Sequence, residues 1–465
     1  MLAAMPPSPS TRPPGAEPPL RDRGDACPGA LRLHGAADGY LARVRLPAGD
    51  LTVRQATDLA DAADRLGDGH LSLTSRGNAE LRGLPEGCGA ELAGLLRDAG
   101  LLPSARHERV RNILASPLAG LTPNSPARVR RWARELDGLL CASEPATALS
   151  GRFLFVLDDG RGELAGLGGD VSLVAEAAPA GGTPGAGDTA LLRVGDDPAA
   201  LRIAGPDAPR AALAAAEAFL TAAAAGGSGA WRVRELPDGQ RLTARDVAEH
   251  LHRTGISATY LTRAPAPAAP VAPRAAAPGI VEGPDGTAAL SVLAPLGRLT
   301  SAQWRLLTAV AADDGCGALR LTPWRGVVLP GLPGLPAGAA AARLSALAAA
   351  GLITDPRSPW HRLGACTGRP GCAKSLTDVR TDVAAAVTAG APVPGAPPAA
   401  VPDGLPVHWS GCARRCGHPH GAWVDVLATE EGYRVSVVRP AAAPPPGDTP
   451  APPPHPAPPA PSHTP

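Results

Sequence analysis

The chain has 465 residues, enough for two to four domains with a large buried core. Its 44 basic and 43 acidic residues nearly cancel, which argues against a general nucleic-acid or anionic-membrane surface. No apolar run of about 18 residues lacks a charge, and the N-terminus has no apolar core of a secretory signal. We therefore expect a cytoplasmic protein that neither binds nucleic acid nor spans a membrane.

Proline is concentrated at the two ends and in one internal segment. Residues 1–28 and 441–465 have the composition of disordered, Pro-rich tails. Residues 263–278, rich in Pro and Ala, read as a semi-rigid linker between two halves. The parts between these segments have the composition of folded domains.

The two halves resemble each other at an offset of 247 to 249 residues. Leu51-Thr52 corresponds to Leu299-Thr300, and residues 69–77 (GHLSLTSRG) correspond to residues 317–326 (GALRLTPWRG). Because order and offset are both kept, the simplest explanation is two tandem copies of one unit.

Each copy reads as strand, helix, strand, strand, helix. In the first copy, residues 40–46 alternate as a strand and Thr52 can cap the helix that follows. Residues 70–74 and 79–84 read as short strands, and residues 89–99 as a second helix. We predict a mixed α+β fold in which two pseudo-symmetric halves bury a ligand at a shared face.

Four of the eight cysteines are clustered as C-x5-C and C-x3-C: Cys366, Cys372, Cys412 and Cys416. Four thiols in an intracellular chain indicate a metal, and both zinc and an iron–sulfur cluster accept four sulfurs. The C-x5-C spacing is wide for a zinc knuckle, so the spacing favours a cluster. We also expect a helix from Cys372, with Leu376, Val379 and Val383 on one face and its positive N-terminus near the cluster.

The cysteine pattern followed by residues 410–419 (SGCARRCGHP) resembles the cluster signature of the siroheme sulfite and nitrite reductase superfamily. Residues 365–375 (ACTGRPGCAKS) and 73–84 (LTSRGNAELRGL) most resemble the precorrin-3B synthase family of the aerobic cobalamin pathway. The resemblance covers about residues 29–438.

The resemblance implies a tandem repeat of ferredoxin-like half-domains and reductase-type domains. The implied half-domains are residues 29–100 and 279–350. The first reductase-type domain, 101–262, has no cluster cysteines, and the second, 351–440, binds the cluster.

The resemblance also implies cofactors and a reaction. A [4Fe-4S] cluster would be held by Cys366, Cys372, Cys412 and Cys416, and in siroheme members the last of these bridges cluster and haem iron. The implied reaction is oxygen-dependent monooxygenation of precorrin-3A to precorrin-3B, with hydroxylation of the macrocycle and lactone formation. A non-haem iron accompanies this activity; His408, His418 and His420 lie near the cysteines but are read as structural.

Arginines are the candidate catalytic and substrate-binding residues. Arg76 and Arg111 match the reductases' anion-binding arginines, and Arg152 and Leu154 stand where those enzymes have paired lysines. The loss of one cation at Leu154 weakens the reductase reading. Guanidinium groups pair well with the carboxylates around a precorrin. The set expected at the shared cleft, whether catalytic or substrate-binding, is Arg76, Arg82, Arg111, Arg152, Arg325 and Arg362.

Three functions remain open on the sequence. The leading one is the precorrin monooxygenase; the second is a siroheme-dependent sulfite or nitrite reductase; the third is a non-catalytic module with structural zinc. Because no G-x-G-x-x-G follows a predicted strand, we expect NADH to act through a separate electron-transfer protein.

Overall fold

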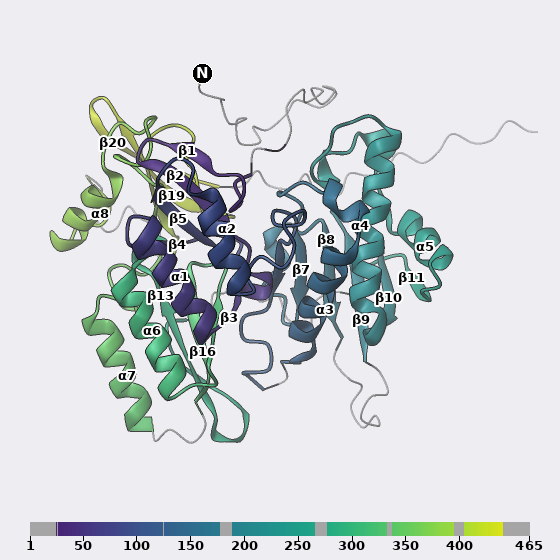
Figure 1. The fold of residues 1–465 in the computed structure, drawn as a ribbon, viewed down its shortest axis with the longest axis horizontal. Coiled ribbons are helices and arrows are strands. Elements are labelled where there is room, and N and C mark those ends of the chain that lie inside the picture. The colour runs from purple at the N-terminus through teal and green to yellow at the C-terminus, as the bar shows by residue number, and fades with distance from the viewer. Residues whose placement is uncertain are drawn as a thin grey trace, which may run out of the picture.

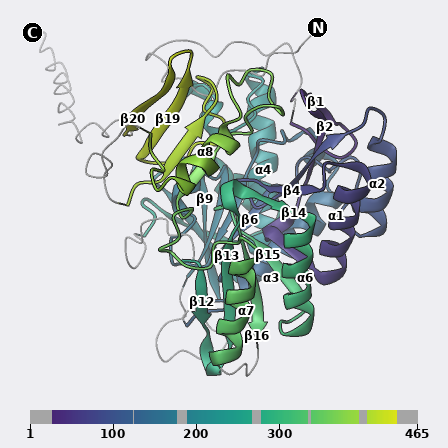
Figure 2. The same cartoon turned by 90° about the vertical axis from the view of Figure 1, so that its left-hand side faces the viewer.

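The computed structural model describes residues 25, 27–123, 125–176, 188–265, 277–332, 337–394 and 404–439. Within these ranges the chain forms four β-sheets flanked by helices, and the two views show how they are arranged (Figures 1 and 2). This architecture confirms the predicted α+β class. Most of the predicted tails and linker lies outside the described residues. Residues 25, 27 and 28 of the N-terminal tail and residues 263–265, 277 and 278 of the linker are described. No helix in the described ranges is long and apolar enough to cross a membrane.

The first copy of the repeat forms a five-stranded antiparallel sheet in the order β1-β2-β5-β4-β14. Its strands are β1 (His34–Ala36), β2 (Gly39–Val44), β5 (Ala79–Leu84), β4 (His70–Leu73) and β14 (Arg298–Thr300). Helices α1 (Val53–Leu66) and α2 (Gly89–Asp98) pack on it. As expected, Thr52 caps α1: its side chain accepts from the Gln55 N–H, and Gln55 reaches back to the Thr52 N–H.

The second copy forms a matching sheet in the order β12-β13-β16-β15-β3. Its strands are β12 (Gly279–Glu282), β13 (Ala288–Leu293), β16 (Gly326–Leu332), β15 (Ala318–Leu321) and β3 (Asp50–Thr52). Helices α6 (Ser301–Asp313) and α7 (Ala337–Ala349) belong to this copy, and Thr300 caps α6 in the same way that Thr52 caps α1.

The two copies exchange one strand each. β3 pairs with β15 of the second copy, with Leu51 opposite Leu319, and β14 pairs with β4 of the first, with Leu299 opposite Leu71. Helices α1 and α6 pack together, and one hydrophobic core spans both sheets. The exchange makes the two half-domains a single folding unit with a pseudo-two-fold relation.

The third sheet has the order β11-β10-β9-β8-β7-β6 and occupies the right-hand part of Figure 1. Its strands are β6 (Ile113–Ala115), β7 (Phe155–Asp158), β8 (Val171–Ala175), β9 (Thr189–Val194), β10 (Ala200–Ala204) and β11 (Ala258–Leu261). Its helices are α3 (Arg128–Ala142), α4 (Ala208–Ala225) and α5 (Ala244–Arg253). Strands β6, β7 and β8 are parallel, so the loops that follow β6 and β7 leave the same edge of the sheet.

The fourth sheet, β17-β18-β19-β20, carries the clustered cysteines and repeats this parallel arrangement. Its strands are β17 (Leu363–Ala365), β18 (Val407–Ser410), β19 (Trp423–Thr429) and β20 (Gly432–Val438), and its helix is α8 (Val379–Thr388). β17, β18 and β19 are parallel and β20 is antiparallel. The third and fourth sheets are therefore related in the same way as the two half-domains.

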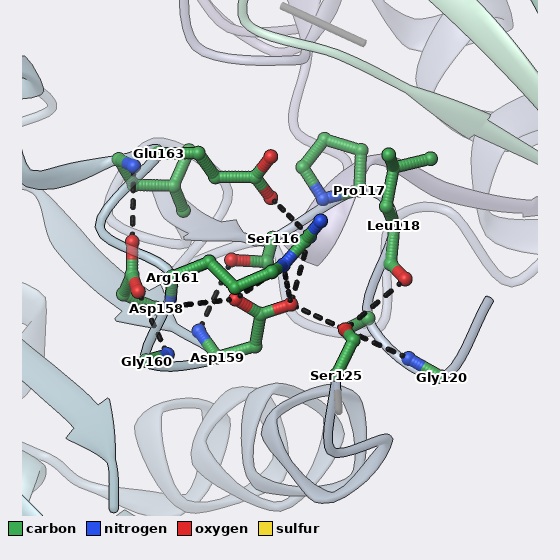
Figure 3. Close-up of polar contacts among 12 residues, drawn as sticks. Ser116, Pro117, Leu118, Gly120, Ser125, Asp158, Asp159, Gly160, Arg161 and Glu163 are labelled. Carbon is green, nitrogen blue, oxygen red and sulfur yellow. Dashed lines mark hydrogen bonds and ion pairs between the residues drawn. The ribbon is translucent and has the colours of Figure 1, made fainter. Parts of the chain in front are cut away.

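In the third sheet, a buried polar network closes the loops that correspond to the cysteine loops of the fourth (Figure 3). Ser116 follows β6 as Cys366 follows β17, and its hydroxyl accepts from the Asp159 N–H. Arg161 bonds to Asp159 and to Glu163. Burial, helped by Asp159 and opposed by Arg161, raises the pKa of Glu163 to about 7. This edge of the third sheet is thus filled by side chains.

The elevated pKa of Glu163 predicts a pH-dependent stability. The pKa in the folded chain exceeds the ordinary value of 4.5, so the folded state binds the extra proton, and stability is lost as pH rises from about 5 to 8. The full effect is about 3 kcal/mol at 1.36 kcal/mol per pKa unit. Glu163→Gln, which mimics the protonated form, is expected to flatten the dependence of the melting temperature on pH over this range.

The exposed Glu135 on α3 supplies the matched control, because Glu135→Gln should leave the pH dependence of the wild-type chain intact. If the melting temperatures of wild type and Glu163→Gln changed with pH in parallel, Glu163 would be ionised on both sides of neutrality. Its pKa would then not be raised, and the prediction would be wrong.

Candidate functional site

A cavity of about 320 Å³ lies where the first half-domain meets the third sheet. Side chains from β2, from the turn after β4 and from the segment before β7 line it, together with residues near the N-terminal limit of the described chain. The lining is Asp25, Cys27, Pro28, His34, Leu41, Arg43, Arg45, Thr74, Ser75, Arg76, Asn78, Asn112, Gly151, Arg152 and Trp231. Four arginines against one aspartate make the cavity strongly cationic.

Arg45 is the most deeply placed of these cations, with 3 % of its surface exposed. Its Nε donates to the Arg109 carbonyl oxygen (3.2 Å), and its Nη1 is buried without a hydrogen-bond partner. Burial and the neighbouring Arg43 lower its pKa to about 9, so it is still protonated at neutral pH. A buried guanidinium nitrogen without a partner is costly, and an anionic ligand in the cavity would satisfy it.

Arg76 is presented by a tight turn. The Thr74 hydroxyl accepts from the backbone N–H groups of Arg76 (3.3 Å) and Asn78 (3.1 Å). Arg76 Nη1 donates to the Gly151 carbonyl oxygen (3.2 Å), and burial, followed by Arg232, lowers its pKa to about 10. Arg76, which the sequence predicted at a shared ligand cleft, lines this cavity in the structure.

Arg152 and Arg43 complete the cationic wall. The Arg152 guanidinium lies over the Trp231 ring, 5.0 Å from its centroid. Arg43 bonds to Glu80 (2.8 Å), so its charge is largely compensated. Among the described residues, Arg45, Arg76 and Arg152 form no ion pair. Three cations in one small cavity thus lack a carboxylate partner in the part of the chain that the structure describes.

Asp25 is held by hydrogen bonds from the chain, and its charge acts on Arg45 without forming an ion pair with it. Burial would raise its pKa, but hydrogen bonds from the Cys27 and Gly151 N–H groups and from the Ser150 hydroxyl lower it overall. The nearby Cys27 has a raised pKa, because its thiol is buried and lies beside Asp25. Cys27 is therefore protonated at neutral pH, as expected for an inert thiol.

The four clustered cysteines lie on two loops at one edge of the fourth sheet. Cys366 follows β17 directly, and Cys412 follows β18 after one glycine. The Cys366 N–H donates to the Trp409 carbonyl oxygen (3.0 Å), and the Gly411 N–H donates to the Cys366 sulfur (3.2 Å). A Cβ at Gly411 would lie 1.8 Å from the Ser375 oxygen, so only glycine brings this N–H to the sulfur.

The thiols lie close enough to affect one another electrostatically. Burial is the main cause of the raised pKa of Cys416, and the other three cysteines add to it. Burial also raises the pKa of Cys366, and Cys412 and Cys372 raise it further. Within the described ranges, no three His, Cys, Asp or Glu side chains converge tightly enough for a single metal ion. Four neighbouring thiols, with a backbone N–H directed at one sulfur, fit the donor set of an iron–sulfur cluster.

The helix expected from Cys372 begins seven residues later, so that prediction was wrong. α8 starts at Val379, where the Asp378 side chain accepts from the Thr381 N–H. Residues 372–378 are instead turns tied to the neighbouring loops, since the Leu376 N–H donates to the Gly411 carbonyl oxygen. Leu376 is consequently exposed rather than packed on a helix face, whereas Val379 and Val383 are buried as expected. The helix N-terminus lies at Val379, which still packs against the cysteine loops.

The histidines near the cysteines have structural surroundings. His408 is fully buried, its Nε2 lies 3.1 Å from the Cys416 carbonyl oxygen, and burial followed by Arg325 lowers its pKa to about 3. His418 stacks on Trp423 with ring centroids 5.2 Å apart. Burial, His418, Arg234 and Arg76 lower the pKa of His420. Arg76 lines the cationic cavity and also affects the pKa of His420. The loop after Cys416 therefore lies near that cavity.

The remaining predicted arginines are not in the cavity. Arg111 is buried and forms a bidentate pair with Asp137 (2.6 and 2.7 Å) while donating to the Leu101 carbonyl oxygen. Arg82 pairs with Asp38 and Glu80, and Arg325 donates to the Gly417 carbonyl oxygen. Arg362 is exposed. Of the predicted set, the structure therefore brings Arg76 and Arg152 together.

Sequence reasoning missed Arg43 and Arg45. A usable signal was present in residues 40–46 (YLARVRL), where arginine alternates with apolar residues along a strand. Ala42, Val44 and Leu46 enter the core, so the two arginines share the opposite face.

Comparison with known proteins agrees with this arrangement. The nitrite/sulfite reductase ferredoxin-like half domain matches residues 34–98 and 281–347, the two copies of the repeat. The chain is 28 % identical to a precorrin-3B synthase of Sinorhizobium sp over 89 % of its length and 83 % of that protein's. It is 27 % identical to a ferredoxin–nitrite reductase of Synechococcus elongatus, over 84 % of this chain and 76 % of the reductase.

The fold is also found among solved structures. The Mycobacterium tuberculosis NirA protein superposes with a TM-score of 0.65 at 17 % identity, over 85 % of this chain and 74 % of NirA. The chain therefore contains two nitrite/sulfite reductase ferredoxin-like half domains and shares the overall fold of NirA. It resembles the Sinorhizobium precorrin-3B synthase along most of both chains, as the cysteine-loop residues predicted.

Proposed function

We propose that the chain is a precorrin-3B synthase that hydroxylates a tetrapyrrole with dioxygen in cobalamin biosynthesis. The observation that carries the proposal is the cavity in which Arg45, Arg76 and Arg152 lack a carboxylate partner among the described residues. A precorrin carries acetate and propionate groups around its rim, and guanidinium groups bind carboxylates through two parallel hydrogen bonds. The resemblance to the Sinorhizobium synthase supports the same assignment.

The cavity size suits one edge of such a ligand. At about 320 Å³ it is at the small end of ligand pockets, so it would take a carboxylate arm and the ring edge that bears it. Arg45 and Arg76 would fix that arm, and Trp231, held by Arg152, offers an aromatic surface beside it. The chain's own residues would thus orient the macrocycle.

Cys366, Cys372, Cys412 and Cys416 would hold a [4Fe-4S] cluster, which supplies one-electron transfer when bound. In the proposed reaction one atom of dioxygen enters the macrocycle as a hydroxyl group and the other leaves as water. The two electrons required come from NADH through a separate electron-transfer protein. A non-haem iron belongs to the same proposal, and no ligand set for it is assigned.

A siroheme-dependent nitrite or sulfite reductase is the alternative, favoured by the 27 % identity to the Synechococcus enzyme. One feature of the segment that follows Arg152 argues against it. Leu154 is buried with Leu114, Val156 and Leu164, at the position where the resemblance leads us to expect a second lysine for a small oxyanion. A neutral side chain packed in an apolar cluster adds no charge and no proton to such a site.

The assay that tests the proposal uses the anaerobically purified full chain with precorrin-3A, an NADH-dependent reductase and ¹⁸O₂. We expect a product that retains one labelled oxygen atom, and no product without dioxygen. Label derived from water, or nitrite or sulfite reduction in place of hydroxylation, would contradict the proposal. Turnover with NADH and the pure chain alone would contradict the need for a separate electron carrier.

Arg76→Lys tests the bidentate contact. A point charge replaces a planar fork, so we expect KM for the tetrapyrrole to rise roughly fivefold, corresponding to about 1 kcal/mol. The absorption spectrum of the cluster should not change, because Arg76 lies outside the cysteine loops. An unchanged KM would place Arg76 among residues that do not contact the ligand.

A further inference from the structure

Two arginines, one from each half-domain, reach the loops that carry the clustered cysteines. Arg82, on β5 of the first half-domain, donates from Nη2 to the carbonyl oxygen of Gly371, the residue before Cys372 (2.9 Å). Arg325, before β16 of the second, donates from Nη2 to the carbonyl oxygen of Gly417, the residue after Cys416 (2.9 Å). The half-domains thus hold both loops through the same kind of contact.

Two more arginines lie in this group, and the four differ in how their charge is compensated. Arg82 pairs with Asp38 and Glu80, and Arg298 pairs with Asp68 (2.6 Å). Arg325 and Arg380 form no ion pair with any described residue. We call these four residues, Arg82, Arg298, Arg325 and Arg380, the arginine collar.

Arg380 is the member of the collar nearest in sequence to the cysteine loops. It is the second residue of α8. The preceding Val379 packs closely against both cysteine loops. A Cβ added to Gly368 would lie 2.9 Å from the Val379 nitrogen, and a Cβ added to Gly411 would lie 3.0 Å from Val379 Cγ2. The Arg380 Nε is buried without a hydrogen-bond partner. Its backbone is therefore fixed beside the cysteine loops, while its guanidinium forms no ion pair with a described residue.

The electrostatics of Arg380 agree with this placement. Burial, followed by Arg298, Arg325 and Arg82, lowers its pKa to about 10, and Cys366 acts in the opposite direction. Arg380 is therefore still charged at neutral pH, surrounded by other cations and within electrostatic range of the Cys366 thiol. A cluster held by four thiolates carries net negative charge, and this charge would compensate the collar.

We propose that Arg380 raises the reduction potential of the iron–sulfur cluster assigned to Cys366, Cys372, Cys412 and Cys416, by supplying an uncompensated positive charge beside it. The inference rests on that cluster assignment in the proposed function. One-electron reduction adds one negative charge to the cluster, and a fixed cation nearby stabilises the reduced form over the oxidised form. Arg380 keeps its proton throughout and exchanges no electron.

The test is a potentiometric titration of the anaerobically purified full chain, with dithionite as reductant and electron paramagnetic resonance of the reduced cluster as readout. Arg380→Gln should lower the equilibrium constant for reduction about tenfold, which is a shift of 59 mV to more negative potential for one electron. Arg380→Lys keeps the charge and should restore most of the wild-type potential. Arg434→Gln removes an exposed arginine on β20 of the same domain and should leave the potential unchanged.

The outcomes separate this inference from the assignment beneath it. A wild-type chain without iron and sulfide would overturn the cluster itself. An intact cluster in Arg380→Gln, with the potential of the Arg434→Gln control, would overturn the role of Arg380 alone. If Arg380→Gln loses its iron, the lysine variant decides: recovery of iron content supports a role of the charge, and equal loss in both variants means that Arg380 acts through packing.

Discussion

Substitution of Cys416 by serine is expected to abolish turnover and to lower the iron content of the purified chain. A hydroxyl is a poor substitute for a thiolate toward iron, and the Cys416 sulfur lies near the other three thiols of the group, which add to the effect of burial in raising its pKa. The measurement is iron and acid-labile sulfide per chain, together with the visible spectrum and the rate of tetrapyrrole hydroxylation.

Cys316 provides the matched control for this substitution. It is an exposed cysteine of the second half-domain, outside the two cysteine loops, so Cys316→Ser should keep iron, spectrum and rate. Full iron content and normal turnover in Cys416→Ser would mean that Cys416 is not a ligand.

Replacement of Arg45 by glutamine is expected to raise KM for the tetrapyrrole by about 10- to 100-fold. Hydrogen bonds to charged groups contribute about 1.5–3 kcal/mol, and every 1.4 kcal/mol is tenfold in affinity. The same substitution should not lower the melting temperature of the ligand-free chain, because it removes a buried cation that lacks a carboxylate partner among the described residues. Steady-state kinetics and thermal melts report the two effects separately.

The exposed Arg97 at the end of α2 is the control for charge removal in the same half-domain, and Arg97→Gln should change neither quantity. A lower melting temperature of Arg45→Gln with an unchanged KM would show that Arg45 serves the fold, through its bond to the Arg109 carbonyl oxygen, and not the ligand.

Local signals predicted the repeated elements well. Thr52 caps its helix as predicted, and its counterpart Thr300 caps α6 in the same way. Strands β4 and β5 lie close to the residue ranges predicted for them. The strand exchange between the copies could not be predicted from the same signals. β3 and β14 are three residues long, and their partners β15 and β4 lie more than 200 residues away in the other copy, beyond the reach of any periodicity.

The candidate site was predictable only in part. The face of β2 that points away from its own core is buried by another part of the chain, which the local sequence does not reveal. The alternation in β2 identifies the face that carries Arg43 and Arg45, but only the third sheet and Trp231 turn that face into a cavity. The pairing of Arg111 with Asp137 is similarly non-local, since 26 residues separate them. The late start of α8 had a local signal: Asp378 followed by Thr381 is a capping pattern.

The most direct test of the central claim is the visible spectrum and metal content of the full chain, purified without oxygen and before any substrate is added. We expect broad brown iron–sulfur absorption, with at least as much iron as acid-labile sulfide and no sharp tetrapyrrole bands. Sharp bands with stoichiometric siroheme would identify a nitrite or sulfite reductase instead. A colourless protein containing zinc would contradict the account altogether.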